Sequence, residues 1–153
     1  MGIEKDVSIT KFENERNKVL VNILYTASWI RGGFNKILKP YKLSEQQFNV
    51  LRILRGQYPT PAMLSLIQSR MLDKMSNATR LVDKLERKGL VSRTRNEYNR
   101  RQVNILITER GLDLLKELDV VMKDYLEGFA DYSIEDTRLL SDLLDRLREV
   151  EES

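Results

Sequence analysis

The chain has 153 residues, of which 41% are hydrophobic and 32% are charged. That length supports one packed core and is short for two ordinary domains, so we expect a single domain over residues 1–153. The sequence contains no cysteine and no histidine. It therefore lacks the side chains for disulfides, thiolate nucleophiles, imidazole bases and the common zinc sites, and we expect neither a metal nor a cofactor.

The charges are distributed unevenly along the chain. The net charge of the whole sequence is only +3. Residues 70–101 nevertheless contain ten Lys and Arg and four Asp and Glu, a net charge of +6, and the remainder of the chain carries −3. A concentrated cationic segment on a slightly acidic body is typical of a nucleic-acid-binding surface, and a solvated charged helix is the alternative. The charged amino-terminal segment has no long apolar run, which indicates a cytoplasmic protein without a membrane span.

Helical periodicity dominates the first part of the chain. Apolar residues recur at steps of three and four over residues 12–38, which predicts a long helix that ends before Pro40. Ser44, followed three residues later by Gln47, is a capping-box signal for a second helix that extends to Gly56.

Two shorter helices are predicted next. Thr60 is suited to cap the third helix, and Pro61 is suited to its first position. The fourth helix is predicted from about Lys74 to Lys88. Gly89 then stands where a left-handed cap at a helix end is expected.

The hydrophobic period then changes from helical spacing to alternation. Residues 91–95 and 103–107 alternate in the manner of two antiparallel strands. The polar loop between them is too long for a two-residue turn, so we expect it to project as a flexible flap. Thr108 is predicted to cap a fifth helix, and Ser133 begins a last helix that reaches Val150 with a continuous leucine seam.

Two short helices joined by a tight turn, the second with an exposed cationic face, followed by a basic hairpin, describe a winged helix-turn-helix. The expected fold class is mainly α with a small antiparallel β-hairpin. The winged helix-turn-helix is predicted over residues 44–107, with its wing at about 91–107, and dimerisation helices flank it at 12–38 and 109–151. The start of such a recognition helix fits the major groove of B-DNA and reaches the base edges.

Ten residues are predicted to contact DNA. Polar side chains at the start of the fourth helix suit base edges, lysines near that helix suit phosphates, and arginines of the hairpin suit a narrow minor groove. The set is Lys74, Ser76, Asn77, Thr79, Arg80, Lys84, Lys88, Arg95, Arg100 and Arg101. The alternative is a surface ion pair of little energetic value for each helix residue, and an aggregation-blocking charged edge for the hairpin.

The segments ATRLVDKLERKGLVSR and TRNEYNRRQVNILITERG, with LSEQQFNVLRIL ahead of them, resemble the MarR family of bacterial transcription regulators, named for the multiple-antibiotic-resistance regulator. The resemblance covers the recognition helix, its exit, the wing and the strand that returns from the wing. It implies a homodimeric, largely helical protein that binds pseudo-palindromic DNA, often as a ligand-responsive repressor.

One position departs from the family pattern. The wing of the family has an acidic residue that forms a salt bridge with the wing arginine, and in this chain that position is Asn99. The ion pair that would steady Arg101 is therefore replaced, at most, by a neutral hydrogen bond, with Glu97 as an alternative partner.

The apolar stripes of the first, fifth and sixth predicted helices exceed what a small winged module covers. They predict a homodimer built from both chain ends, with two recognition helices about one DNA turn apart, and a simple core within one chain is the alternative for such stripes. The resemblance also implies a cleft between the dimerisation helices and the winged module for small anionic or aromatic effectors. The candidate lining residues are Tyr25, Trp29, Arg31 and Met63, and an ordinary core position is the alternative for Trp29.

The predicted function is that of a dimeric, sequence-specific, DNA-binding transcriptional regulator of the repressor type. The alternative is a protein-interaction module on a winged-helix scaffold, although such a module would not need a cationic recognition helix and wing. An enzyme is not expected, because most general-base schemes fail without histidine and no pair of acids has a recognisable catalytic spacing.

Overall fold

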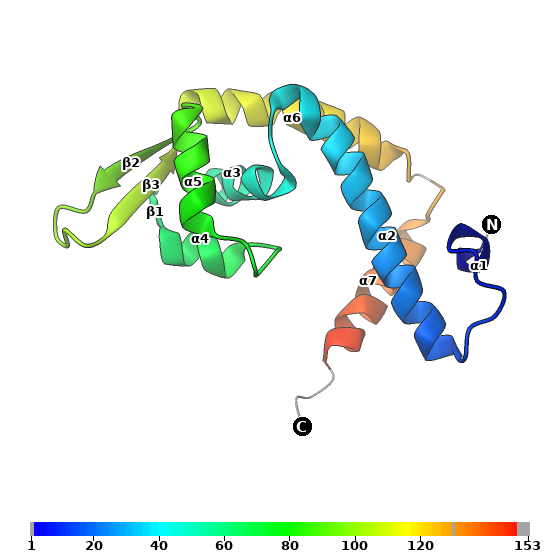
Figure 1. Cartoon of the computed structure of the whole chain (residues 1–153). Helices are drawn as coiled ribbons and strands as arrows, with labels where there is room; N and C mark the ends of the chain where they lie inside the picture. Colours follow the sequence, from blue (N-terminus) through cyan, green and yellow to red (C-terminus); the bar gives the residue numbers. More distant parts are fainter. Residues whose placement is uncertain (1, 130, 150–153) are drawn as a thin grey trace. The chain divides into compact units, whose positions relative to one another are not determined.

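The computed structural model of the chain describes residues 2–129 and 131–149 (Figure 1). The predicted fold class is confirmed: the described residues are mainly helical, with one small antiparallel sheet that has three strands rather than two. The chain divides into two compact units, Met1–Leu115 and Lys116–Ser153. Within the described ranges, no helix is both long enough and apolar enough to cross a membrane.

The first long helix, α2 (Glu15–Leu38), begins three residues later than the predicted start at residue 12. Asn14 sets this start, because its side-chain oxygen accepts a hydrogen bond of 2.9 Å from the backbone N–H of Asn17. A short helix that the sequence did not predict, α1 (Ile3–Asp6), packs on α2. The helix ends as predicted near Pro40, where a single 3₁₀ turn, η1 (Lys39–Tyr41), follows.

The second predicted helix is α3 (Glu45–Gln57), and its capping box is confirmed. The Ser44 hydroxyl accepts from the Gln47 N–H at 3.1 Å, and the Gln47 side-chain oxygen accepts from the Ser44 N–H at 3.2 Å. Two backbone donors at the helix start are thereby satisfied, which fixes the point where the chain enters the winged module.

The predicted start of the third helix is wrong. Helix α4 (Leu64–Arg70) does not begin at Pro61, and Thr60 does not cap it. Residues Ala62–Met63 instead form strand β1, which pairs antiparallel with β3 (Val103–Ile107). A two-residue strand has no recognisable period of its own, so only the exposed edge of β3, which lies about 40 residues further along the chain, selects this conformation.

The fourth helix, α5 (Ala78–Arg87), begins four residues after the predicted Lys74. Asn77 holds an extended backbone, and its side-chain oxygen accepts from the Arg80 N–H at 3.1 Å. This cap competes with helix at the preceding residues, which explains why Lys74 lies in the turn before α5.

The predicted glycine cap after α5 is confirmed. Gly89 has a φ of +71°, a conformation that glycine adopts without steric cost. The N–H of Leu90 donates to the Leu85 carbonyl at 3.0 Å, and the N–H of Gly89 donates to the Glu86 carbonyl at 2.9 Å. The chain then turns directly into strand β2.

The two predicted strands are confirmed as an antiparallel hairpin. Strand β2 (Val91–Arg95) pairs with β3, with Val91 opposite Ile107 and Arg95 opposite Val103. The strand order in the sheet is β1-β3-β2. Because β3 is central, its side chains Ile105 and Ile107 are buried.

The core of the first unit lies where α3 packs against α4, α5 and β3. Burial of apolar area in this core fixes the position of α5 relative to the sheet. Its fully buried side chains include Leu38, Val50, Leu51, Leu54, Ile67, Met71, Val82, Leu85, Ile105 and Ile107.

Two helices follow the sheet. Thr108 caps α6 (Glu109–Glu127) as predicted, since its hydroxyl accepts from the Gly111 N–H at 3.2 Å. Ser133 caps α7 (Ile134–Arg148) as predicted, accepting from the Asp136 N–H at 3.0 Å. The predicted end of this helix at Val150 lies outside the described residues.

Gly111 is expected to be required at the start of α6. A Cβ added there would lie 2.4 Å from the Leu90 carbonyl oxygen and 2.7 Å from Ile107 Cγ1. We expect Gly111→Ala to lower the free energy of unfolding by about 1–3 kcal/mol, because backbone and packed side chain must shift. Urea denaturation followed by circular dichroism measures the change.

The matched control for Gly111→Ala is Gly56→Ala in α3, where an added Cβ would meet nothing within 4 Å. Alanine has the higher helix propensity, so this variant should gain roughly 0.5–1 kcal/mol. If both variants changed the free energy of unfolding in the same direction, the close approach at Gly111 would be contradicted.

Candidate nucleic-acid interface

The turn between α4 and α5, residues 71–77, is held at both ends by amide side chains. Gln68 of α4 donates from Nε2 to the Ser76 carbonyl at 2.8 Å and accepts at Oε1 from the Ala78 N–H at 3.1 Å. Asn49 of α3 accepts from the Leu72 N–H at 2.9 Å. Sequence reasoning missed both residues, since an amide at a half-buried helix position has no distinctive spacing. They fix the direction in which α5 leaves the turn.

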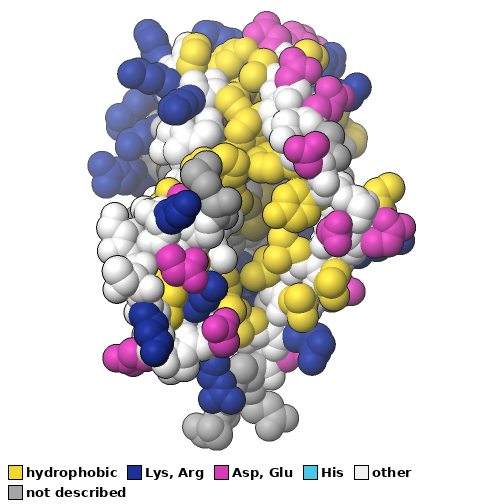
Figure 2. All heavy atoms as spheres, turned by 90° about the vertical axis from the view of Figure 1, so that its right-hand side faces the viewer, with side chains coloured by type: hydrophobic (Ala, Val, Ile, Leu, Met, Phe, Trp, Pro, Cys, Tyr) yellow, Lys and Arg dark blue, Asp and Glu magenta, His cyan; other side chains and the backbone are white. Residues whose placement is uncertain are grey.

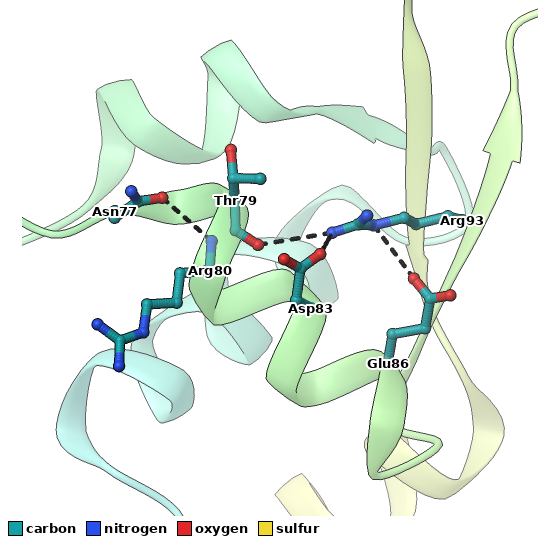
Figure 3. Close-up of polar contacts among 6 residues, drawn as sticks. All are labelled: Asn77, Thr79, Arg80, Asp83, Glu86 and Arg93. Atoms are coloured by element: carbon teal, nitrogen blue, oxygen red, sulfur yellow. Dashed lines mark hydrogen bonds and ion pairs between the residues drawn. The ribbon is translucent and has the colours of Figure 1, made fainter.

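The side chains predicted to read bases lie at the start of α5, but they are not equivalent (Figure 3). Thr79 and Arg80 are exposed, and the Arg80 guanidinium extends away from the helix. Asn77 is exposed too, yet its oxygen turns inward to cap the helix, which leaves its NH₂ group to donate outward. The Ser76 hydroxyl is buried and has no hydrogen-bond partner among the described residues.

The predicted phosphate-binding lysines fall into two groups. Lys84 is exposed on α5, and Lys74 donates from Nζ to the Ser69 carbonyl at 2.6 Å while remaining exposed. Lys88 is different, because its Nζ donates to Gln47 Oε1 at 3.1 Å and to the Lys42 carbonyl. Burial of the ammonium lowers the pKa of Lys88, and the neighbouring cations Lys84 and Lys42 lower it further. Lys88 therefore joins the end of α5 to the start of α3.

Arg93 ties the wing to α5 (Figure 3). It lies on β2 with 29% of its side chain exposed, and its Nε is 3.1 Å from Glu86 Oε2. A terminal nitrogen of the same guanidinium pairs with Asp83 and also lies 3.5 Å from the Thr79 carbonyl oxygen. Two carboxylates and one carbonyl of α5 thus share one wing cation. Asp83 is consequently used by Arg93, and Arg80 forms no ion pair with any described residue.

Asparagine side chains organise the wing loop, residues 96–102. Asn96 Oδ1 accepts from the N–H groups of Tyr98 at 2.9 Å and Asn99 at 3.3 Å. Asn99 Oδ1 accepts from the Arg101 backbone N–H at 3.1 Å, so it orders the backbone beside the arginine rather than its side chain. Glu97 makes no ion pair with Arg101 among the described residues.

A set of cations on this module has no acidic partner in the described part of the chain. Its members are exposed or nearly so, and they flank the turn, α5 and the wing loop. They are Arg70, Arg80, Lys84, Arg87, Arg95, Arg100 and Arg101. Because neighbouring cations repel one another, such a surface favours a polyanionic partner.

The four predicted ligand-binding residues are divided between elements. Tyr25 and Trp29 lie one turn apart on α2, with 39% and 55% of their surface exposed. Arg31 faces α3, where its Nε is 3.7 Å from Glu45. Met63 lies on β1, beside β3 and α4. The structure groups Tyr25 with Trp29 and places Met63 on a separate element.

Comparisons with known proteins agree with this architecture. The model of the MarR family matches residues 43–103, from the residue before the α3 cap to the start of β3. The HTH-type transcriptional regulator PecS of Dickeya dadantii (strain 3937) is 31% identical over 118 residues, covering 74% of this chain and 69% of PecS. The transcriptional repressor MprA of Escherichia coli (strain K12) is 31% identical over 84 residues, and the chain spans about half of its length, 48%.

Solved structures have the same fold. A MarR transcription factor from Planctomyces limnophilus is 30% identical, with a TM-score of 0.67 and coverage of 92% of this chain and 100% of that one. A MarR-like regulator from Bacillus cereus ATCC 10987 has a TM-score of 0.77 at 24% identity, covering 88% and 96%. The chain therefore belongs to the MarR family of winged helix-turn-helix transcription regulators. The family consists of DNA-binding regulators and not of enzymes.

The bridge between Arg93 and α5 is expected to stabilise the module measurably. Arg93→Met should lower the free energy of unfolding by about 1 kcal/mol, because Asp83 and Glu86 then face each other one turn apart without a cation. A double-mutant cycle of Arg93→Met with Asp83→Asn, measured by urea denaturation at low salt, should give a coupling of roughly 0.5–1.5 kcal/mol.

Arg87→Met is the control for this cycle, because Arg87 is exposed on α5 and pairs with no described acid. It should change stability by less than about 0.5 kcal/mol. Additive effects of the Arg93 and Asp83 substitutions would show that the two side chains are not coupled in solution.

Proposed function

We propose that this protein is a homodimeric transcriptional repressor that binds a pseudo-palindromic DNA site through α5 and the wing. The observation that carries the proposal is the contact between α5 and the wing. Arg93 joins them, and most of the charged side chains without an ion pair around them are cations. We infer that α5 enters the major groove and that the cationic wing loop enters the adjacent minor groove, because a helix fits the first and cationic side chains favour the second.

The start of α5 is proposed to read base edges in the major groove. Arg80 is free to form a bidentate contact with guanine. Asn77 offers its NH₂ group as a single donor, and Thr79 offers a hydroxyl that suits a base or a phosphate. Ser76 is assigned a supporting position at the turn, because its hydroxyl is buried.

Phosphate contacts are proposed for the exposed cations that flank α5, namely Lys74, Lys84 and Arg95. Arg100 and Arg101 are proposed to enter the minor groove, where narrow A·T-rich segments concentrate negative potential. Lys88 is proposed to support the interface without contacting DNA, because its ammonium donates to Gln47 and to the Lys42 carbonyl.

The homodimer is proposed to form through residues 12–38 and 109–151. No described residue of α7 is buried within the chain, although the helix exposes four leucines, and α2 exposes further apolar side chains. Figure 2 shows hydrophobic side chains exposed on the side of the chain that it presents. Apolar stripes of this extent are covered in stable proteins, and a second copy supplies the matching surface. The α7 stripe comprises Leu139, Leu140, Leu143 and Leu147, which are 48–57% exposed.

A small aromatic effector is proposed to bind near Tyr25, Trp29, Arg31 and Met63. Two exposed aromatic rings one turn apart on α2 suit an aromatic ligand, and Arg31 of the same helix, which lies against Glu45, supplies a cation for an acid or a phenol. Two proteins of similar fold support this class of ligand. The organohalide-sensing regulator RdhR-CbdbA1625 is solved with 2,4-dichlorophenol, and DNA binding by BpsR of Bordetella bronchiseptica is regulated by 6-hydroxynicotinic acid.

Selection from random DNA duplexes tests the DNA-binding proposal. We expect an inverted repeat whose half-sites lie one helical turn, about 34–36 Å, apart. With about eight phosphate contacts per dimer, log K should fall with log salt at a slope of about −7. Arg101→Ala should weaken binding to all sequences and reduce the slope by about 2, since each protomer loses one cation.

Lys11→Ala is the control for Arg101→Ala. Lys11 is an exposed cation that precedes α2 and lies outside the proposed dimer segments, and its removal should leave both the affinity and the salt slope unchanged. Failure to enrich any site, together with a shallow slope in the parent, would contradict the proposal.

The mass in solution tests the dimer. Sedimentation equilibrium should give twice the chain mass of 18.0 kDa. Leu140→Glu should shift the protein toward the monomer, because a charge on the apolar stripe of α7 cannot be desolvated without a partner. Ser141→Glu on the same helix is the control and should remain dimeric. A parent protein that sediments at 18.0 kDa would exclude the dimer.

The single tryptophan of the chain, Trp29, reports directly on the effector site. Titration with 2,4-dichlorophenol or 6-hydroxynicotinic acid should quench its fluorescence to saturation, because a bound aromatic ring contacts the indole. Trp29→Phe removes the fluorophore, so binding of the ligand to this variant is measured by calorimetry. The association should be weaker than that of the parent. Quenching that rises linearly with ligand and never saturates would place the effector elsewhere.

A further inference from the structure

The three most exposed large hydrophobic side chains in the described chain all lie in two loops of the winged module, the turn before α5 and the wing loop between β2 and β3. Leu72 and Met75, in the turn before α5, are 81% and 92% exposed, and Tyr98, in the wing loop, is 98% exposed. The next value in the described residues is 67%, at Ile134 of α7. Single exposed hydrophobic residues are common on protein surfaces, but this set is confined to the turn and the wing loop, where the predicted DNA-contacting residues also lie.

These side chains do not build the loops that carry them. The turn is held through the Leu72 N–H by Asn49, and through the Met75 N–H by Asp73 Oδ1 at 3.0 Å. The wing loop is likewise held through the Tyr98 N–H by Asn96. All three residues thus contribute only backbone groups to the loops. A polar side chain at each position would keep the same backbone hydrogen bonds and would expose less apolar area to water. Their apolar side chains are available to a partner.

The surrounding charge identifies the partner. The segment around Leu72 and Met75 contains Arg70, Lys74 and Arg80 against one acid, Asp73, whose carboxylate accepts from the Met75 N–H.

The wing loop around Tyr98 contains Arg100 and Arg101, which pair with no described acid, against Glu97. An apolar protein surface would have to desolvate these cations, whereas the backbone of a nucleic acid neutralises them. DNA is therefore the occupant that satisfies both the apolar and the cationic groups.

We propose that Leu72, Met75 and Tyr98 form apolar DNA contacts that determine part of the sequence specificity. This inference rests on the DNA-binding function proposed above. Met75 and Leu72 contact the 5-methyl groups of thymine, which are the apolar features of the major-groove edge. Tyr98 lies with its ring against deoxyribose in the minor groove, beside Arg100 and Arg101. The preference of this regulator for thymine in its half-sites is then set by the turn as well as by α5.

Replacement of thymine by deoxyuridine tests the turn, because it removes only the 5-methyl group. Each thymine of the selected site is replaced in turn, and affinity is measured by fluorescence anisotropy. The parent should lose about fourfold at one or two positions in each half-site, the factor that burial of one methyl group provides. Met75→Ala or Leu72→Ala should bind the thymine and uracil duplexes equally at the position that each side chain contacts.

Ile9→Ala is the control, since it removes an exposed apolar side chain that lies outside both loops and outside the proposed dimer and effector sites. It should retain the full uracil penalty of the parent. The apolar contacts are excluded if the parent tolerates uracil at every position, or if the penalty persists in both turn variants. A parent that binds no site and has a shallow salt slope would instead exclude the DNA-binding function, and the contacts with it.

The wing contact has a separate signature. Tyr98→Ser should weaken binding about fivefold without changing the salt slope, because no charge is lost. Tyr98→Phe should bind within twofold of the parent, because the ring remains. Arg101→Ala changes the slope and so marks the electrostatic part of the same loop. Parent-like affinity of Tyr98→Ser would overturn the role of the ring.

Discussion

The ion pairs of Arg93 link the wing to α5. Apolar burial positions α5 against the sheet, and hydrogen bonding holds β2 to β3. Arg93 adds a polar link by pairing with Asp83 and Glu86 and approaching the Thr79 carbonyl. The acidic residues of a cationic helix are thus placed where they bind the wing, and the cations that remain are turned outward. One side chain therefore joins these two elements and also pairs the acids of α5, which leaves the unpaired charge of the helix positive.

Some polar side chains that the sequence suggests for DNA binding are already hydrogen-bonded within the protein. Asn77 directs its oxygen to the Arg80 N–H, and Lys88 directs its ammonium to Gln47 and the Lys42 carbonyl. Buried or partly buried donors and acceptors must be satisfied, so a side chain near a helix end is often used locally before it can bind a ligand. The set of residues left for DNA is smaller than the polar composition of α5 and the wing indicates.

Exposed apolar groups on this protein differ in arrangement, and the difference separates two kinds of contact. On α7 the leucines recur along one helix face, which suits a continuous partner such as another helix. Leu72, Met75 and Tyr98 stand singly among cations on loop tips. Isolated apolar tips suit small apolar features set within a charged surface, as thymine methyl groups are in DNA.

The sequence by itself determined the elements whose signals are local. The Ser44–Gln47 capping box, the Gly89 cap, the hairpin strands and the amphipathic helices all depend on residues a few positions apart, and the structure has each of them. Tertiary structure decided what depends on distant partners. Strand β1 exists because the edge of β3 accepts it, α5 begins only after a turn that Gln68 and Asn49 hold, and Arg93 pairs with α5 rather than facing solvent. Such contacts join residues 7 to 43 positions apart, and hydrogen bonds or ion pairs at that separation leave no periodic pattern in the chain.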